Sequence, residues 1–190
     1  GSDIRTAVAT ANRRLRTASR VLLPVVRGAV SDAKTLYALV QSCRWSALIP
    51  SEATIAVSAV TRDRRLNDSR HVALTVKDAV VDAQRAGHGR RSNVDRRNPD
   101  MPIVVHIADG TAEISLDTTG RPLHERGYRT AAGVAPLRET LGAGLVLASG
   151  WDATVPLVDP FCGSGTIAIE AALFAAGTGP GTLGRRFAYE

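Results

Sequence analysis

Residues 157–166 of this 190-residue chain are Leu157-Val158-Asp159-Pro160-Phe161-Cys162-Gly163-Ser164-Gly165-Thr166. A short apolar run, 154–158, ends at an acid, and a glycine-rich turn then leads into the alanine-rich segment 166–176. This order predicts a buried strand, a tight turn and a helix. A helix N-terminus after a parallel strand offers free backbone N–H groups, and glycines let a ligand approach the backbone closely. The stretch therefore predicts a nucleotide-type ligand site in an α/β fold.

Three ligand-binding patterns compete for this turn. A phosphate loop, G-x-x-x-x-G-K-[ST], requires a lysine, and none follows Gly165. A dinucleotide fingerprint tolerates Ala168 as its third small residue, but the carboxylate of Asp159 would repel a pyrophosphate. An acid before the glycines suits a cationic ligand, because the ammonium of a methionine moiety can bond to it. The acid therefore favours S-adenosylmethionine, and a glycine turn that only joins strand to helix is the alternative.

Apolar periodicity predicts the elements on the N-terminal side of this stretch. They are helices over 4–18, 72–86 and 135–149 and strands over 20–30, 54–60, 103–107 and 112–116. Asp109-Gly110 between the last two strands is the strongest hairpin signal in the chain. Pro24 lacks a backbone N–H and favours an edge position for its strand. Ser31 or Asp32 can cap a further helix.

The charge is distributed unevenly along the chain. Residues 1–130 hold 21 basic and 13 acidic residues, whereas residues 131–190 hold 3 and 5. Of the 24 basic residues, only Lys34 and Lys77 are lysines. A basic first part joined to a mildly acidic second part predicts a polyanion-binding module attached to another domain. Solvated surface charge, or an arginine bias in the genome, is the alternative.

Composition excludes several classes of protein. The chain is 44% hydrophobic and 22% charged, which is typical of globular proteins rather than disordered ones. No apolar run reaches the ~18 residues of a membrane span, and no signal peptide is visible. Cys43 and Cys162 cannot make a disulfide framework or a four-cysteine zinc site, and the histidines lack metal-ligand spacing. We therefore expect a cytoplasmic protein with no metal and no membrane partner.

The motif over 159–166 resembles the first motif, D-P-x-C-G-S-G-T, of RNA methyltransferases that modify a base amino group. Other segments are similar to one family within that group: Asn67-Asp68-Ser69, 76–83, 93–96, Asp117-Thr118-Thr119-Gly120, Leu123-His124, Arg126-Gly127-Tyr128-Arg129, 135–140 and Ser149-Gly150-Trp151. The chain resembles THUMP-domain guanine-N2 methyltransferases of the RlmL type, which act on large-subunit (23S) ribosomal RNA.

The resemblance implies an α/β protein that uses S-adenosylmethionine. Its expected parts are the end of a ferredoxin-like unit over 3–50, a THUMP RNA-binding domain over 51–120, a linker over 121–134, and the first elements of a Rossmann-like methyltransferase domain over 135–190. The implied reaction is methylation of the exocyclic amine of a guanine in ribosomal RNA. Transfer RNA is the alternative substrate, and a non-catalytic RNA-binding module is the alternative of another class. The family's Asn-Pro-Pro-Tyr type motif is missing from these 190 residues, so we assign no catalytic residue and expect the chain as given to be inactive.

The resemblance also assigns the cofactor-binding residues, whereas the RNA-binding residues follow from the positions of the basic side chains. For the cofactor they are Pro136, Leu137, Asp159, Pro160, Cys162, Gly163, Ser164, Gly165 and Thr166. For RNA we expect basic side chains and one stacking ring: Arg62, Arg65, Arg70, Lys77, Arg96, Arg126, Tyr128 and Arg129. Solvated charge is the alternative for the arginines, and hinge packing is the alternative for Tyr128. Glu170, one turn into the last helix, is expected to be polar surface.

Overall fold

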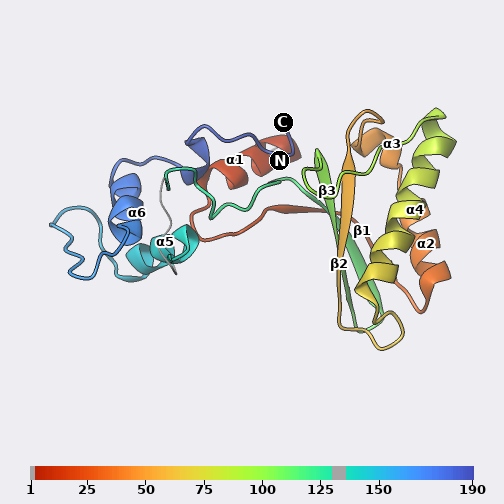
Figure 1. Ribbon diagram of the computed structural model, residues 1–190, viewed down its shortest axis with the longest axis horizontal. Coiled ribbons are helices and arrows are strands. Elements are labelled where there is room, and N and C mark those ends of the chain that lie inside the picture. The colour runs from red at the N-terminus through yellow and green to blue at the C-terminus, as the bar shows by residue number, and fades with distance from the viewer. Residues whose placement is uncertain (1–2, 130–135) are drawn as a thin grey trace. The chain divides into compact units, whose positions relative to one another are not determined.

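The structure is a computed structural model, and it describes residues 3–129 and 136–190 (Figure 1). The chain forms two compact units. The first, Leu22–Gly120, is called the sheet unit below. The second comprises the residues up to Val21 together with Arg121–Glu190, and is called the helical unit.

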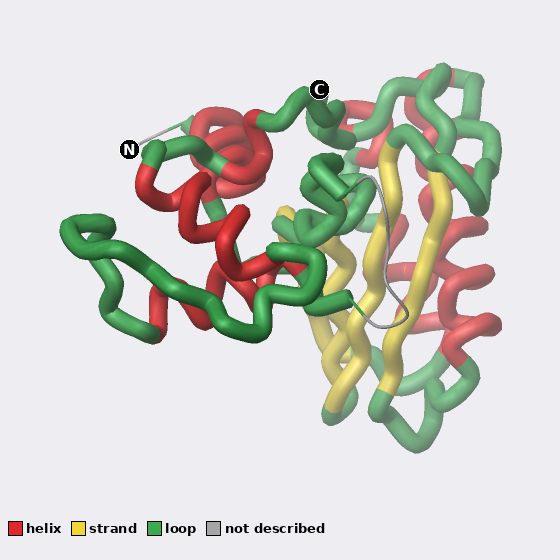
Figure 2. Tube along the Cα trace, turned by 60° about the vertical axis from the view of Figure 1, so that its left-hand side comes forward, coloured by secondary structure: helices red, strands yellow, loops and turns green. Residues whose placement is uncertain are grey.

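A sheet, whose strands are yellow in Figure 2, organises the sheet unit. It has four strands in the order β1-β4-β3-β2. The strands are β1 (Leu22–Ala29), β2 (Ile55–Thr61), β3 (Met101–Ala108) and β4 (Thr111–Asp117). Strands β2 and β3 are parallel, and the other two pairs are antiparallel. Because a parallel pair needs a crossover connection, a long helix joins β2 to β3.

The helices of this unit are α2 (Ala33–Gln41), α3 (Trp45–Leu48) and α4 (Ser69–His88), and α2 and α4 cover one face of the sheet (Figure 1). The core between helices and sheet consists of aliphatic side chains around one buried indole. Its fully buried members include Leu36, Val40, Trp45, Val76, Val80, Ile103 and Ile114. The indole Nε1 of Trp45 donates to the carbonyl of Val40 at 2.7 Å, so burial leaves no polar atom of this ring unsatisfied.

Local sequence signals explain the turns of the sheet unit. Asp109 and Gly110 both have positive φ, 49° and 69°, as a two-residue hairpin between antiparallel strands requires. The predicted hairpin is therefore confirmed. Asp32 caps α2 in a capping box with Thr35. Pro24 lies on β1, which is an edge strand as predicted, next to an irregularity in the pairing with β4.

The domain boundary that we expected at residue 50 falls inside the sheet unit. Strand β1 pairs with β4 along its length, and α2 packs against both α4 and β1. Residues 22–50 therefore share one core with 51–120. The N-terminal residues up to Val21 belong instead with the helical unit.

The helical unit contains α1 (Ile4–Arg14), α5 (Glu139–Ala148), α6 (Thr166–Ala175) and the short 3-10 helix η1 (Pro180–Thr182). Helix α5 packs against α6, and α1 packs against η1. The second contact is very close, because a Cβ built on Gly181 would lie 2.3 Å from the carbonyl oxygen of Asn12. A glycine at position 181 is what permits this approach.

Three predicted elements of the helical unit differ from the structure. The segment 154–158 is not a strand: a strand needs a hydrogen-bonded neighbour, and no described strand pairs with it. The predicted helix over 135–149 begins at Glu139, because Arg138 is extended, with ψ of 138°; residue 135 lies outside the described residues. The helix expected over 4–18 ends at Arg14, where the backbone of Leu15 becomes extended.

None of the helices within the described ranges has the length and apolar character needed to span a membrane.

Candidate functional site

The glycine turn before α6 presents backbone N–H groups to open space. Gly163 and Gly165 have φ of 51° and 77°, a region that non-glycine residues rarely adopt. The N–H of Gly165 donates to the carbonyl of Cys162 at 2.7 Å, which closes the turn. No side chain caps α6, and a Cβ built on Gly163 would meet nothing within 4 Å. The first N–H groups of α6 are therefore available to a ligand.

Asp159 stands at the entrance to this turn. Its side chain is half-buried, and Oδ1 accepts a hydrogen bond from the N–H of Phe161 at 3.1 Å. Its second oxygen has no hydrogen-bond partner in the described part of the chain. A carboxylate with one free oxygen beside free N–H groups can bind a zwitterion, whose ammonium faces the acid and whose carboxylate faces the N–H groups.

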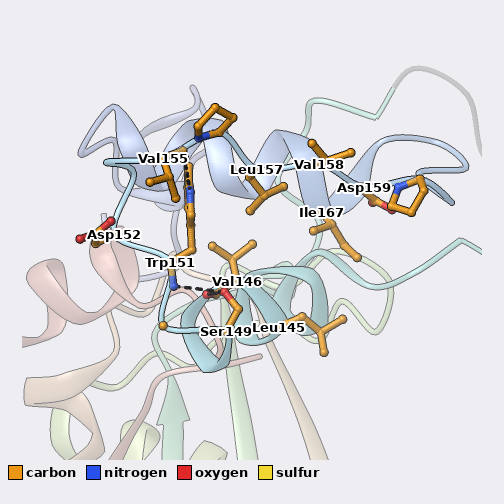
Figure 3. Close-up of a pocket in the computed structure, with 13 residues that line it drawn as sticks. Leu145, Val146, Ser149, Trp151, Asp152, Val155, Leu157, Val158, Asp159 and Ile167 are labelled. Carbon is orange, nitrogen blue, oxygen red and sulfur yellow. Dashed lines mark hydrogen bonds between the residues drawn. The ribbon is translucent and has the colours of Figure 1, made fainter.

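An open, mainly apolar groove of about 620 Å³ adjoins Asp159 and Pro160 (Figure 3). Figure 3 shows side chains from α5, from α6 and from the segment between them around this groove. They include Leu145, Val146, Leu157, Val158 and Ile167. At the far end the indole Nε1 of Trp151 donates to the carbonyl of Val155 at 2.7 Å. A volume of this size lies within the ~300–1,000 Å³ that is typical of small-molecule sites.

Arg129 joins the start of α5 to the start of α6. Its Nε donates to Glu139 Oε1 at 3.0 Å, and Nη2 donates to the carbonyl of Leu137 at 3.0 Å. On the α6 side, Nη1 donates to Ser164 Oγ at 3.1 Å and Nη2 to Thr166 Oγ1 at 3.1 Å. The Arg129 side chain is 18% exposed and the Glu139 side chain 8% exposed. One arginine thus connects a carboxylate, a carbonyl and two hydroxyls.

A second, fully buried ion pair lies one turn further along α6. Arg126 Nε and Glu170 Oε1 are 3.3 Å apart, with side chains 1% and 0% exposed. Arg126 also donates to the carbonyl of Leu123 at 2.8 Å and to the carbonyl of Arg16. The hydroxyl of Tyr128 donates to Glu170 Oε1 at 3.0 Å. Burial, and then the negative charge of Glu170, raise the pKa of Tyr128, so this phenol keeps its proton.

The predicted cofactor residues are distributed as follows. Asp159, Pro160 and the glycines surround the turn and the end of the groove. The hydroxyls of Ser164 and Thr166 are bonded to Arg129, and the Leu137 carbonyl is linked to them through the same guanidinium. Cys162 and Pro136 are exposed. The motif therefore forms one local structure, in which backbone groups rather than hydroxyls face the open side.

Three of the residues that we expected to contact RNA lie in the network just described. Arg126 is buried, so a contact between its side chain and phosphate does not fit the structure. Tyr128 and Arg129 are half-buried and bonded to Glu170 and Glu139. Glu170, which we expected at the surface, is also buried. The sequence around Glu170 could have predicted its burial, because it is the single acid in the apolar run 166–175. An acid buried in such a run needs a hydrogen-bonded partner.

The remaining RNA residues lie on the sheet unit, but not in one cluster. Arg62, Arg65 and Arg70 are exposed on the loop after β2 and the first turn of α4. Arg96 is exposed on the loop that leads into β3. Because β2 and β3 are parallel, these two loops are at opposite ends of the sheet. Lys77 is half-buried and contacts the carboxylate of Asp78.

The acids near the first arginine group are already bonded to the backbone. Asp63 accepts hydrogen bonds from the N–H groups of Arg65, Leu66 and Gly110. Asp68 caps α4 through the N–H groups of Arg70 and His71. These backbone bonds lower the pKa of both carboxyls. No ion pair involves the Arg62, Arg65 or Arg70 side chain within the described ranges, so all three guanidinium groups are open to an external anion.

Two family models match the chain. Residues 30–117 match the THUMP domain, and residues 126–190 match the RMKL-like methyltransferase domain. The chain is 40% identical over 171 residues to "Putative RNA methyltransferase slr0064" of Synechocystis sp.. The aligned segment covers 90% of this chain and 44% of that protein.

Solved structures are similar over almost the whole chain. A structure titled as a predicted N6-adenine-specific DNA methylase from Listeria monocytogenes has a TM-score of 0.88 and 32% identity, covering 97% of this chain and 48% of the other. The structure of "SMU.472, a putative methyltransferase complexed with SAH" has a TM-score of 0.87 and 30% identity, covering 100% of this chain and 50% of the other.

The chain spans about half the length of these relatives. Within that span the fold is mixed α/β. Strands β2, β3 and β4 lie inside the segment that matches the THUMP domain, and the glycine turn lies inside the segment that matches the methyltransferase domain. The chain is therefore similar to the THUMP domain over residues 30–117 and to the RMKL-like methyltransferase domain over residues 126–190, as its motifs indicated.

Proposed function

We propose that this protein is an RNA methyltransferase that takes its methyl group from S-adenosylmethionine. The observation that carries the proposal is the combination of Asp159 with the uncapped glycine turn at 163–165. A relative with a similar structure is described as complexed with SAH, which supports the choice of donor. The match to a THUMP domain and the relative described as an RNA methyltransferase support RNA as the acceptor.

The residues present fit the methionine part of the donor. The free oxygen of Asp159 would accept from its ammonium, and the N–H groups at the start of α6 would donate to its carboxylate at the positive end of the helix dipole. The bare backbone of Gly163 leaves space for this approach. When bound, the donor supplies an electrophilic methyl group on a sulfonium.

The proposed acceptor is the exocyclic amine of a guanine in 23S ribosomal RNA, because the motif resembles that of enzymes that modify a base amino group. Such a transfer needs the amine in line with the methyl group, so positioning supplies most of the rate. Since the 190 residues contain no Asn-Pro-Pro-Tyr type motif, we expect this chain by itself to transfer no methyl group.

For RNA we propose that Arg62, Arg65 and Arg70 bind phosphates at one end of the sheet unit. Their charges are not paired with carboxylates, and Asp63 and Asp68 beside them are engaged by backbone N–H groups. Arg96 offers a separate contact at the opposite end. Arginines on loops meet the phosphate backbone more readily than base edges, so the expected recognition depends on RNA shape.

The donor site is tested by equilibrium dialysis of this chain with radiolabelled S-adenosylhomocysteine (SAH), the donor without its methyl group. Asp159→Asn removes the charge that the ammonium needs, so we expect its affinity to fall about 10- to 100-fold, as for the loss of a charged hydrogen bond. Asp152→Asn is the matched control, because Asp152 lines the same groove but its carboxylate is bonded to Thr154. Absence of SAH binding by the wild-type chain at millimolar concentration would contradict the proposal.

The acceptor is tested by mapping methyl groups in nucleic acids from cells that lack the protein. Loss of one methyl group from a guanine amine in 23S ribosomal RNA is the expected result. Loss from a transfer RNA would identify the alternative substrate, and loss from adenine in DNA would overturn the proposal. A complete set of methyl groups in the deletion cells would also contradict it.

A further inference from the structure

The contacts of Arg129 suggest a role beyond charge balance. A guanidinium has five N–H donors, and four of those on Arg129 are engaged by groups of this chain. Two of the acceptors, Glu139 Oε1 and the Leu137 carbonyl, belong to the start of α5. The other two, Ser164 Oγ and Thr166 Oγ1, belong to the glycine turn and the first residue of α6.

Neither helix start is held by a cap of its own. The residues that precede α5 and α6 are Arg138 and Gly165, and neither makes a side-chain hydrogen bond to its helix. The first-turn N–H groups of a helix have no intrahelical hydrogen-bond partners, and without an N-cap side chain they lack that partner as well. The Arg129 guanidinium supplies the missing constraint from outside, because it bonds simultaneously to residues on both sides.

We propose that Arg129 is a positioning residue that holds the glycine turn at 163–165 in the conformation that receives the donor. This inference rests on the proposed donor site. Direct binding of a ligand by Arg129 is less compatible with the geometry, because only one of its N–H groups is unused. Ordering the turn in advance strengthens binding, since a ligand then does not have to order it.

The planar fork of arginine explains why this residue type suits the position. Its three nitrogens reach Glu139 on one side and the two hydroxyls on the other at 3.0–3.1 Å. A lysine ammonium is a single point with three donors and cannot span both sides. Arg129→Lys therefore keeps the charge that Glu139 requires but loses the link between the helices.

The test compares Arg129→Lys with Arg138→Lys in the whole chain. Arg138 is the matched control, because it precedes α5 with an exposed side chain. The first measurement is amide hydrogen exchange at Gly165 without any ligand. We expect Arg129→Lys to speed this exchange about tenfold and Arg138→Lys to leave it unchanged. Thr166→Val removes one acceptor while keeping Arg129, and it should give a smaller increase at the same amide.

The second measurement is the SAH dissociation constant of the same variants. Arg129→Lys should weaken SAH binding about tenfold, in parallel with the faster exchange. Unchanged exchange in Arg129→Lys overturns the proposal, and unchanged exchange with weaker SAH binding would show that Arg129 contacts the ligand directly. If the wild-type chain binds no SAH, the proposed function fails, but the exchange at Gly165 still decides whether Arg129 orders the turn.

Discussion

Replacement of Glu170 by glutamine should destabilise the helical unit and leave the sheet unit unaffected. The substitution leaves Arg126 buried, 1% exposed, without a counter-charge. Breaking a buried ion pair by removing one partner costs ~3–5 kcal/mol. Glutamine retains an oxygen for Arg126 and Tyr128, so we expect the lower end, about 3 kcal/mol. For a unit of this size, a loss of about 3 kcal/mol corresponds to a thermal unfolding midpoint lower by roughly 12–24 °C.

The assay uses the two tryptophans, because each unit contains one. Trp45 is buried in the core of the sheet unit, and Trp151 lies beside the groove in the helical unit. After labelling with fluorotryptophan, urea unfolding of each unit is followed by its own fluorine resonance. In Glu170→Gln the Trp151 transition should move to lower urea concentration, whereas the Trp45 transition should stay at its wild-type position.

Two controls separate burial from charge. Glu125→Gln removes an acid from an exposed ion pair with Arg121 and should cost no more than ~1 kcal/mol. Replacing both Arg126 and Glu170 by methionine removes both charges of this buried pair and should recover most of the loss. If the unfolding free energy of Glu170→Gln lies within ~0.5 kcal/mol of wild type, or if the Trp45 transition moves as far as that of Trp151, the buried ion pair does not stabilise the helical unit as described.

Changing Arg62, Arg65 and Arg70 to glutamine should reduce by about 2–3 the slope of log binding constant against log salt concentration for RNA, measured by filter binding. The matched control changes Arg90, Arg91 and Arg97 at the opposite end of the sheet and should reduce the slope less. Equal effects of the two triple changes would argue against a localised site. Because the pKa of Tyr128 is raised in the folded state, the unfolded state loses this proton first, and the stability that it contributes below pH ~10 is lost as the pH rises above 10. The urea midpoint of unfolding should therefore fall less steeply from pH 9 to 11 in Tyr128→Phe than in wild type. Parallel curves for the two proteins would contradict this. Gly181→Ala should lower the melting temperature of the helical unit, because its Cβ would lie 2.3 Å from the carbonyl oxygen of Asn12. Gly144→Ala is the control, since its Cβ would meet only the Thr17 side chain, at 3.7 Å. Similar melting temperatures for the two variants would show that α1 does not pack as described.

Elements with local signals could be predicted from the sequence. The hairpin follows from Asp109-Gly110, the edge position of β1 from Pro24, and the crossover helix from its apolar periodicity. The glycine turn follows from the spacing of Gly163 and Gly165, since its conformation depends mainly on the missing Cβ atoms. In each case the cause lies within a few residues of the effect.

Features that depend on distant partners could not be predicted in the same way. The segment 154–158 has the composition of a strand, but a ladder requires a neighbour that composition does not reveal. The separation of Arg62 from Arg96 follows from the parallel pairing of β2 with β3. The role of Arg126 depends on Glu170, 44 residues away, so that an arginine expected at RNA is an internal ion-pair partner.

We propose that two ligands bind two different parts of this chain: a methyl donor at the turn 163–165 and RNA at the loop 62–70. Both are tested by amide chemical shifts of the ¹⁵N-labelled protein during separate titrations with SAH and with a short RNA hairpin. We expect SAH to shift the amides of Gly163, Ser164 and Gly165, and RNA to shift those of the loop 62–70. Unshifted amides in the turn with SAH, or RNA shifts confined to the loop 89–100, would show that the two ligands do not bind at these places.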